Sequence, residues 1–234
     1  MSKHTSFSTA GFFNQEMADA YDRRNAGLKP ISDCLHFLMG LTLEGVPDKA
    51  RVLCVGVGTG AEIFSLAAIH PDWHFVGVDP SPEMLAVAQH RLDEVGIMDR
   101  CQLVQGYAED VAEDGFHVVV SLLVAHFIQR AERPAFYRAI YDRLKPGGRF
   151  VSAEISGDLS APEFPAMLDD WKQVQKRMGA TEESLASLEE MLRNMLGVVT
   201  PAETESFWRE AGFSLPIPFF QAFMVRGWHA QKPL

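Results

Sequence analysis

The chain has few cysteines and lacks any long uninterrupted apolar segment. Its 234 residues contain three cysteines, Cys34, Cys54 and Cys101, which are widely spaced. Such cysteines form neither a disulfide framework nor a metal-ligand pattern, so we expect a cytoplasmic protein without a metal site. The longest apolar run, FHVVVSLLVAHFI, is interrupted by His and Ser and is too short to span a bilayer. The N-terminus also lacks a signal-peptide pattern, and we expect no membrane partner.

Positive charge is scarce as well. The 21 Lys and Arg residues are outnumbered by 31 Asp and Glu residues, which gives a formal net charge of -10. Binding to a nucleic-acid backbone requires clustered Lys and Arg, so we expect no nucleic-acid partner. The densest basic stretch, residues 130–149, is interleaved with apolar residues at helical spacing. We interpret it as the solvated face of a helix.

Strand and helix patterns alternate over residues 51–156. Short apolar runs typical of buried strands are separated by helical patterns, an order that predicts βαβ units and a parallel sheet. The runs do not alternate with polar residues, which indicates helices on both faces of the sheet. The expected strands are ARVLCVGV, HFVGVD, CQLVQG, FHVVVSLLV and RFVSAEI. With two more strands in the tail, we predict a Rossmann-like, doubly wound, mostly parallel seven-stranded sheet whose last strand is antiparallel.

The remaining segments complete a single domain of residues 1–234. We expect a helical N-terminal cap over 1–50, a cofactor-binding core over 51–156 and a helical insertion or lid over 157–211. Residues 212–234 would form the closing strand pair. Met and Leu stripes in the insertion are interpreted as core packing; they comprise Phe164, Met167, Leu168, Trp171, Leu185, Leu188, Met191, Leu192 and Met195.

A glycine-rich loop follows the first expected strand, in VLCVGVGTGAE at residues 52–62. Glycines let backbone amides approach a ligand, and the helix that follows points its positive end at anionic groups. Gly56, Gly58 and Ala61 fit the dinucleotide pattern G-x-G-x-x-G/A, whereas Gly56, Gly58 and Gly60 fit G-x-G-x-G. Asp79, about twenty positions later at a strand end, has the spacing of a ribose-binding acid. Ribose binding does not distinguish NAD from other adenosyl cofactors.

One further pattern is typical of a dehydrogenase. Tyr141 and Lys145 have the Y-x-x-x-K spacing of short-chain dehydrogenases. However, we expect Lys145 to be the last helical residue before Pro146, an ordinary position for a cation at a helix end. No serine lies a dozen residues upstream, and the glycine loop of that family is absent. We interpret the match as accidental.

The ordered set of motifs resembles the class I S-adenosylmethionine-dependent methyltransferases over residues 50–232. The first motif of that family is similar to VLCVGVGTG, and the ribose-binding motif is similar to VGVDPSPEMLAVAQ. The later motifs, in family order, are similar to VQGYAEDV, FHVVVSLLVAHFI, LKPGGRFVSAE and a final AGF followed by two strands. The resemblance implies S-adenosylmethionine as the cofactor.

The resemblance assigns residues to the methionine and ribose parts of the cofactor. Gly56, Gly58 and Gly60 would pass under the methionine moiety and the ribose. Asp79 would bind the ribose hydroxyls, and Ser121, with the leucine that follows it, would line the methionine side.

For the adenine, the resemblance implies packing by Pro80 or Met84. The backbone of Ala108, together with Glu109 or Asp110, would meet the adenine edge.

Two positions depart from the family pattern. The first-motif acid, which helps to hold the methionine ammonium, is replaced by Cys54. The aspartate that usually precedes Ala108 is replaced by Tyr107, so Glu109 is the alternative partner of the adenine amino group.

The second half is most similar to carboxy-S-adenosylmethionine synthase, in residues 132–156, 191–213 and 219–223. That enzyme uses an arginine just before a Met-Leu pair to bind the added carboxylate, and this chain has Glu189 there. The resemblance therefore disfavours carboxyl transfer.

The predicted activity is in-line methyl transfer to a small, partly apolar organic molecule, in which positioning contributes most of the rate. If the acceptor must lose a proton, the candidate bases are His126, Glu154 and Tyr21. Two alternatives stay open: a non-methylating user of S-adenosylmethionine or a derivative, and a non-catalytic binding or dimerisation module. The oligomeric state is open, with a homodimer as one option.

Overall fold

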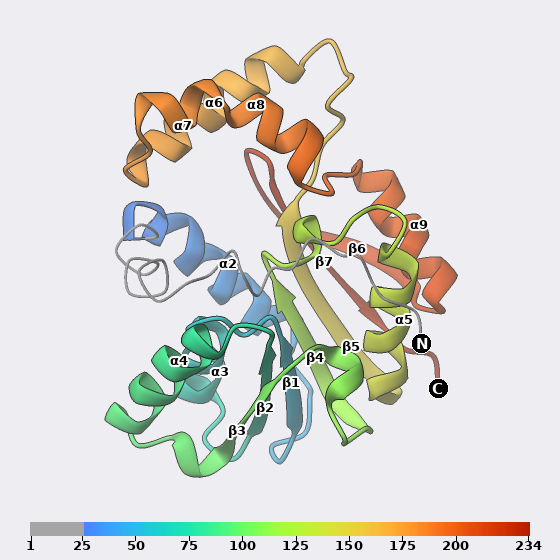
Figure 1. Cartoon of the computed structure of the whole chain (residues 1–234). Helices are drawn as coiled ribbons and strands as arrows, with labels where there is room; N and C mark the ends of the chain where they lie inside the picture. Colours follow the sequence, from blue (N-terminus) through green and yellow to red (C-terminus); the bar gives the residue numbers. More distant parts are fainter. Residues whose placement is uncertain (1–25) are drawn as a thin grey trace, which may run out of the picture.

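The computed structural model describes residues 26–234, which form one seven-stranded sheet in the order β3-β2-β1-β4-β5-β7-β6 (Figure 1). β7 runs antiparallel to both of its neighbours, and the pairings among β1 to β5 are parallel. The predicted mostly parallel sheet with an antiparallel last strand is therefore confirmed. The strands are β1 Arg51–Val55, β2 His74–Asp79, β3 Cys101–Gln105, β4 Phe116–Leu122, β5 Leu144–Ile155, β6 Ser214–Ala222 and β7 Val225–Gln231.

Helices cover both faces of this sheet, as the unbroken apolar strands indicate. The longer ones are α2 Lys29–Thr42, α3 Ala61–Ile69, α4 Pro82–Glu94, α5 Arg133–Arg143, α6 Phe164–Arg177 and α9 Pro201–Ala211. The shorter ones are η2 Ala26–Leu28, η3 Met98–Arg100, η4 Ala108–Asp110, η5 Ala125–Phe127, α7 Glu182–Ala186, α8 Leu188–Glu190 and the π-helical turn η6 Met191–Met195. Helices α2, α3 and α4 pack on one face, and α5 and α9 pack on the other.

Local sequence signals account for where several helices begin and end. Ser81 caps α4 by accepting a hydrogen bond from the Met84 backbone, and a proline follows at the first helical position, as predicted. At α9, Thr200 and Glu203 form a reciprocal capping box. Gly212 ends that helix with φ of 109°, a left-handed conformation that glycine adopts without strain. These ends set the loop lengths between the helices and the sheet.

Residues 157–211 are largely helical, as predicted. Figure 1 shows α6, α7 and α8 beyond the carboxyl end of β5, away from the sheet faces. Their apolar stripes, which include Phe164, Leu168 and Trp171, share one buried core with residues of α2 and of the sheet, among them Leu35, Ala153 and Phe220. Met195 differs from the expected core packing, since it is 42% exposed. That this segment acts as a lid stays a prediction.

The N-terminal prediction is tested only in part. The second expected helix, in residues 31–45, corresponds to α2. The first expected helix and the candidate base Tyr21 lie outside the described residues. Within residues 26–234, no helix is both long enough and apolar enough to cross a membrane.

Two expectations about the basic stretch were wrong. Arg133 has 0% exposure rather than lying on a solvated face, because Glu154 of β5 supplies a buried partner. Helix α5 ends at Arg143, and Lys145 belongs to β5 instead of the helix. The physical reason is that a residue directly before a proline, here Pro146, is disfavoured in helical backbone.

Candidate cofactor site at the carboxyl edge of the sheet

The glycine loop joins β1 to α3 at the carboxyl edge of the sheet, where the strand order changes direction between β1 and β4. Gly56, Gly58 and Gly60 have φ of 69°, 51° and 86°, the left-handed region in which other residues are strained. Ala61 is the first residue of α3. The positive φ of Gly60 accounts for the third glycine of the G-x-G-x-G pattern, whereas the helical position of Ala61 is compatible with either pattern.

Close packing adds a second constraint on the first glycine. A Cβ atom placed on Gly56 would lie 2.3 Å from the Cγ2 atom of Val124, which follows β4. The Gly56 amide donates to the carbonyl of Val78 in β2 at 2.8 Å. The loop is thus held between the ends of β2 and β4, the two strands that flank β1, at the position where open α/β sheets bind ligands.

Asp79 ends β2 directly beside the loop. One carboxylate oxygen accepts a hydrogen bond from the Gly58 amide and the other from the Ser81 amide, each at 2.9 Å. Asp79 is 7% exposed, and this burial raises the pKa of its carboxyl, while the two backbone hydrogen bonds lower it. The side chain orders both turns of the site, and its predicted ribose contact would be added to this role.

The two residues predicted to contact the adenine ring, Pro80 and Met84, follow the end of β2 and lead into α4. Met84 is buried in the first turn of α4, and its Cε atom lies 3.4 Å from where a Cβ atom on Gly58 would stand. Pro80 is partly buried between Asp79 and the cap of α4. The structure brings both residues next to the glycine loop, and adenine packing stays a prediction.

The predicted adenine-edge segment follows β3. The Gly106 amide donates to the Asp79 carbonyl at 3.1 Å, which joins this segment to the end of β2. The carbonyls of Ala108 and Glu109 accept hydrogen bonds from the Arg143 guanidinium at 3.1 and 2.8 Å. The Asp110 amide donates to the Tyr107 carbonyl at 3.0 Å, and the exposed Glu109 side chain is a group left for an adenine edge.

The end of β4 forms the opposite rim. Ser121 is fully buried, and its Oγ atom has no hydrogen-bond partner among the described residues. Leu123 has φ of 58°, a strained conformation for a leucine, and its amide donates to the Ala153 carbonyl at 2.6 Å. Strained backbone of this kind is found where surrounding contacts determine it, frequently at functional sites.

Two of the candidate bases have contacts that restrict proton transfer. His126 is 4% exposed, and its Nδ1 atom accepts a hydrogen bond from the Ile155 amide at 3.3 Å. Burial, aided by the charge of Arg133, lowers the pKa of His126 to about 3, so the ring is neutral at pH 7. Glu154 is 1% exposed and ion-paired with Arg133 at 2.5 Å.

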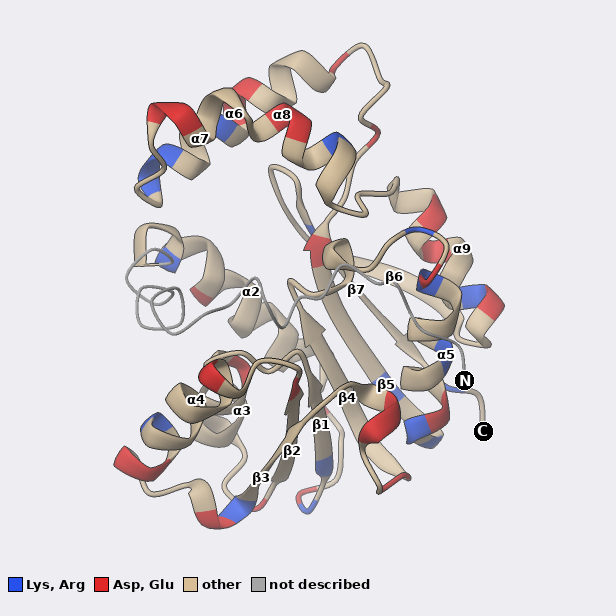
Figure 2. Cartoon of the chain, in the orientation of Figure 1, with Lys and Arg blue, Asp and Glu red and all other residues tan. Residues whose placement is uncertain are grey.

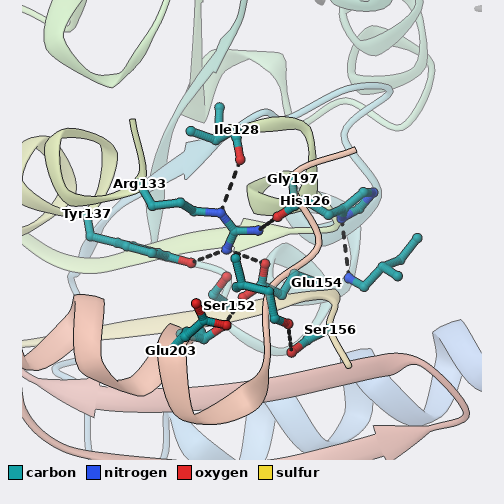
Figure 3. Close-up of polar contacts among 12 residues, drawn as sticks. His126, Ile128, Arg133, Tyr137, Ser152, Glu154, Ser156, Gly197 and Glu203 are labelled. Atoms are coloured by element: carbon teal, nitrogen blue, oxygen red, sulfur yellow. Dashed lines mark hydrogen bonds and ion pairs between the residues drawn. The ribbon is translucent and has the colours of Figure 1, made fainter. Parts of the chain in front are cut away.

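Sequence reasoning missed the role of Arg133, which joins four segments (Figure 3). Its guanidinium donates to the Ile128 carbonyl, the Gly197 carbonyl, the Tyr137 hydroxyl and the Glu154 carboxylate. The other Glu154 oxygen accepts from the Thr204 hydroxyl at 2.7 Å. No local sequence pattern reveals this network, because its members are distant in the chain; Arg133 and Gly197, for example, are 64 residues apart.

A second missed residue is Glu62, in the first turn of α3. It is 5% exposed, and its Oε1 atom has no hydrogen-bond partner in the described part of the chain. Burial raises the pKa of this carboxyl to about 8, and the charge of Asp79 adds to the effect. One signal could have identified it: Glu62 is the single charged residue in α3, AEIFSLAAI.

Charged side chains outside the site are mixed in sign. Figure 2 shows Lys and Arg scattered among Asp and Glu along the outer helices rather than gathered on one element. The absence of a nucleic-acid partner stays a prediction from the net charge.

Comparisons with known proteins agree with this geometry. A family model described as a methyltransferase domain matches residues 52–148. Among curated proteins, the chain is similar to a carboxy-S-adenosyl-L-methionine synthase of a Nitratiruptor species. The two are 26% identical over 215 residues, which cover 89% of this chain and 87% of that protein.

Two solved structures have similar folds. Human N-acetylserotonin methyltransferase, in complex with S-adenosylmethionine, aligns with a TM-score of 0.65 and 15% identity over 100% of this chain. The chain spans 61% of that human protein. Geranyl diphosphate C-methyltransferase of Streptomyces coelicolor A3(2), solved with S-adenosyl-L-homocysteine, aligns with a TM-score of 0.61 and 11% identity over 86% of this chain and 79% of that one.

The matched residues contain the glycine loop, Asp79 and the end of β4, which are the parts that form the candidate site. S-adenosylmethionine is the cofactor of this family. The predicted resemblance to the class I S-adenosylmethionine-dependent methyltransferases is confirmed: a methyltransferase-domain model matches residues 52–148, and these solved methyltransferases share the fold.

Proposed function

We propose that this chain binds S-adenosylmethionine at the carboxyl edge of the sheet and transfers the methyl group to a small organic acceptor. The main support for the proposal is a hydrogen bond between the glycine loop and Asp79. The Gly58 amide donates to the Asp79 carboxylate, so the loop and the ribose-binding acid lie within one hydrogen bond of each other. An adenosyl group needs both in this arrangement.

The residues present fit the parts of the cofactor. Three glycines without side chains leave room for the methionine moiety and the ribose beside the backbone. The Asp79 carboxylate is an acceptor for two ribose hydroxyls, and Met84 offers a soft apolar surface to the adenine. The N-terminus of α3 favours the methionine carboxylate.

The bound cofactor would supply a methyl group on a positively charged sulfur, which is already activated for in-line displacement. The chain's part is then to hold donor and acceptor in line and to exclude water. The helices α6 to α8, which would help to do this, have Phe164, Leu168 and Trp171 buried in the core, so the small, partly apolar acceptor rests on the composition of the segment alone.

We infer that His126 and Glu154 position the rim of the site and do not act as bases. A histidine with a pKa of about 3 is a weak proton acceptor at neutral pH. Both oxygens of Glu154 already accept hydrogen bonds, from Arg133 and Thr204. Tyr21 stays a prediction, and an acceptor that carries its own lone pair needs no base.

Calorimetric titration of the whole chain with S-adenosylmethionine, S-adenosylhomocysteine and NAD tests the proposal. We expect the first two to bind and NAD not to bind. Binding of NAD alone would overturn the proposal. Transfer of the labelled methyl group to candidate small acceptors then measures the activity itself.

A second candidate is carboxy-S-adenosylmethionine synthesis. It is favoured by the similarity to curated proteins of that name over most of both chains. It is disfavoured by Glu189 at the position of the carboxylate-binding arginine, where the side chain pairs with Arg193 at 2.8 Å. Mass spectrometry of the ligand that co-purifies separates the candidates, because the carboxylated cofactor is heavier by one CO₂ unit.

A further inference from the structure

The Glu62 carboxyl is buried next to the glycine loop without a compensating cation. Its Oε1 atom has no hydrogen-bond partner within residues 26–234, and its own backbone amide donates to the carboxyl. None of the ion pairs in this part of the chain includes it. Burying an acceptor without a partner is costly, and buried charges are normally paired. A positively charged ligand group would remove this cost.

The position of Glu62 relates it to the candidate site. It is the second residue of α3, two positions after Gly60. The charge of Asp79 raises the pKa of Glu62, and the charge of Glu62 raises the pKa of the Cys54 thiol. Cys54 lies on the sheet face that packs against α3. Ile63, the residue after Glu62, belongs to the same buried cluster as Cys54, so the first turn of α3 packs on β1 directly behind the glycine loop.

We propose that Glu62 binds the ammonium group of the methionine moiety of S-adenosylmethionine. The inference rests on the function proposed above. The cofactor has two cationic groups, of which only the ammonium has N–H donors that can satisfy an unpartnered oxygen. A charge-assisted hydrogen bond to a carboxylate is also among the stronger contacts available. Glu62 thus supplies, from α3, the negative charge that Cys54 does not supply from β1.

The chemistry of Cys54 agrees with this division. Burial is the main cause that raises the pKa of its thiol well above the usual value, so the side chain is neutral at pH 7. A neutral thiol is a weak acceptor for an ammonium. Asp79 has both oxygens directed at backbone amides and serves the ribose in the proposed site. Glu62 is the carboxyl in this group that has an oxygen to spare.

The proposal predicts a proton release. In the unliganded protein, burial and the neighbouring Asp79 hold the pKa of Glu62 at about 8, so most molecules carry a proton on this carboxyl at pH 7. Pairing with an ammonium favours the ionised form. Binding of a ligand with an ammonium therefore transfers up to one proton from Glu62 to the buffer.

The experiment is calorimetry at pH 7 in two buffers of different ionisation enthalpy, with wild-type protein, Glu62→Gln and Glu94→Gln. Two ligands are compared: S-adenosylhomocysteine, which has the ammonium, and methylthioadenosine, which lacks the amino-acid part. Glu94, exposed at the end of α4, gives a control with the same substitution at a surface position. We expect Glu62→Gln to weaken S-adenosylhomocysteine about 10- to 100-fold and to leave methylthioadenosine within about twofold.

The wild-type protein alone also tests the proposal, which guards against a variant that does not fold. It should release a proton on binding S-adenosylhomocysteine and none on binding methylthioadenosine. Equal proton release with both ligands, or equal weakening of both by Glu62→Gln, would overturn the ammonium contact. If wild-type protein binds neither ligand, the proposed function itself fails, and with it this inference.

Discussion

Two buried glutamates differ in how the fold treats them. Glu154, 1% exposed in β5, accepts hydrogen bonds at both oxygens and pairs with Arg133. Glu62, 5% exposed in α3, has an oxygen without a partner and no cation in any ion pair of the described residues. The first carboxylate is completed by the protein, and we propose that the second is completed by a ligand. Burial alone therefore does not distinguish a structural carboxylate from a binding one; the partners do.

The largest expected effect comes from removing the ion pair between Arg133 and Glu154. Arg133→Met leaves Glu154 buried without its cation, and we expect the free energy of unfolding to fall by about 3–5 kcal/mol. Urea denaturation measures it. The matched control is Arg138→Met in the same helix, whose ion pair with Asp142 is 60% exposed on the arginine side and should change stability by less than about 1 kcal/mol. Similar losses in both variants would contradict the assigned role of Arg133.

The next effect concerns the acid beside the loop. Asp79→Ala should weaken S-adenosylhomocysteine at least about 100-fold, because the ribose hydroxyls and the loop lose the same acceptor. Calorimetry measures the affinity, and circular dichroism checks that the variant is folded. Asp93→Ala, at an exposed position of α4, is the control. Unchanged affinity in the Asp79 variant would remove this residue from the ribose.

The third prediction concerns how the stability of the protein depends on pH through Glu62. The folded-state pKa of Glu62, about 8, lies above the ordinary value of 4.5, so between these values the folded state binds more protons than the unfolded state. Stability should therefore fall as pH rises through this window, whereas Glu62→Gln lacks this contribution. Between pH 5 and pH 8, we expect the free energy of unfolding of Glu62→Gln to rise by about 2 kcal/mol relative to that of the wild type. This is less than the maximum that a change in pKa from 4.5 to about 8 allows.

Thermal unfolding of both proteins at several pH values measures this difference. The difference between the two proteins cancels the titration of all other groups. A constant difference across the range would mean that Glu62 already has a partner in the unliganded protein.

The smallest expected effect distinguishes the glycine loop from a turn outside the candidate site. Gly60→Ala and Gly96→Ala both place a side chain at positive φ, 86° and 69°, and each should lose about 1 kcal/mol of stability. Because only Gly60 belongs to the candidate site, only its variant should also lose affinity for S-adenosylhomocysteine. An equal effect of both variants on binding would contradict the contact between this loop and the cofactor.

Much of the sheet could be predicted because its signals are local. Five apolar runs and the closing pair correspond to β1 to β7, and Ser81 caps α4 as expected. The spacing of the three glycines also specified the loop, since their positive φ values are a property of that short segment. A pattern of this kind is read from neighbours in the chain, so a single sequence contains it.

The contacts of the two buried glutamates could not be predicted from local sequence patterns. Glu154 was a candidate base because of its place at a strand end, and its pairing with Arg133 and Thr204 could not be read from that place. Arg133 was interpreted as part of a solvated helix face because the basic residues of 130–149 are interleaved with apolar residues at helical spacing. Glu62 stood inside the quoted loop motif, yet its burial depends on how α3 packs on β1.

The sequence by itself determined the order of strands and helices, the glycine loop and the acid at the end of β2. Apolar periodicity, capping residues and positive-φ glycines all act over a few residues. The tertiary structure decided which charged side chains are buried and what each one meets, as with Arg133 beside Glu154 and Glu62 beside Cys54 and Asp79. The physical reason is that the free energy of a buried charge depends on partners that folding brings from distant parts of the chain.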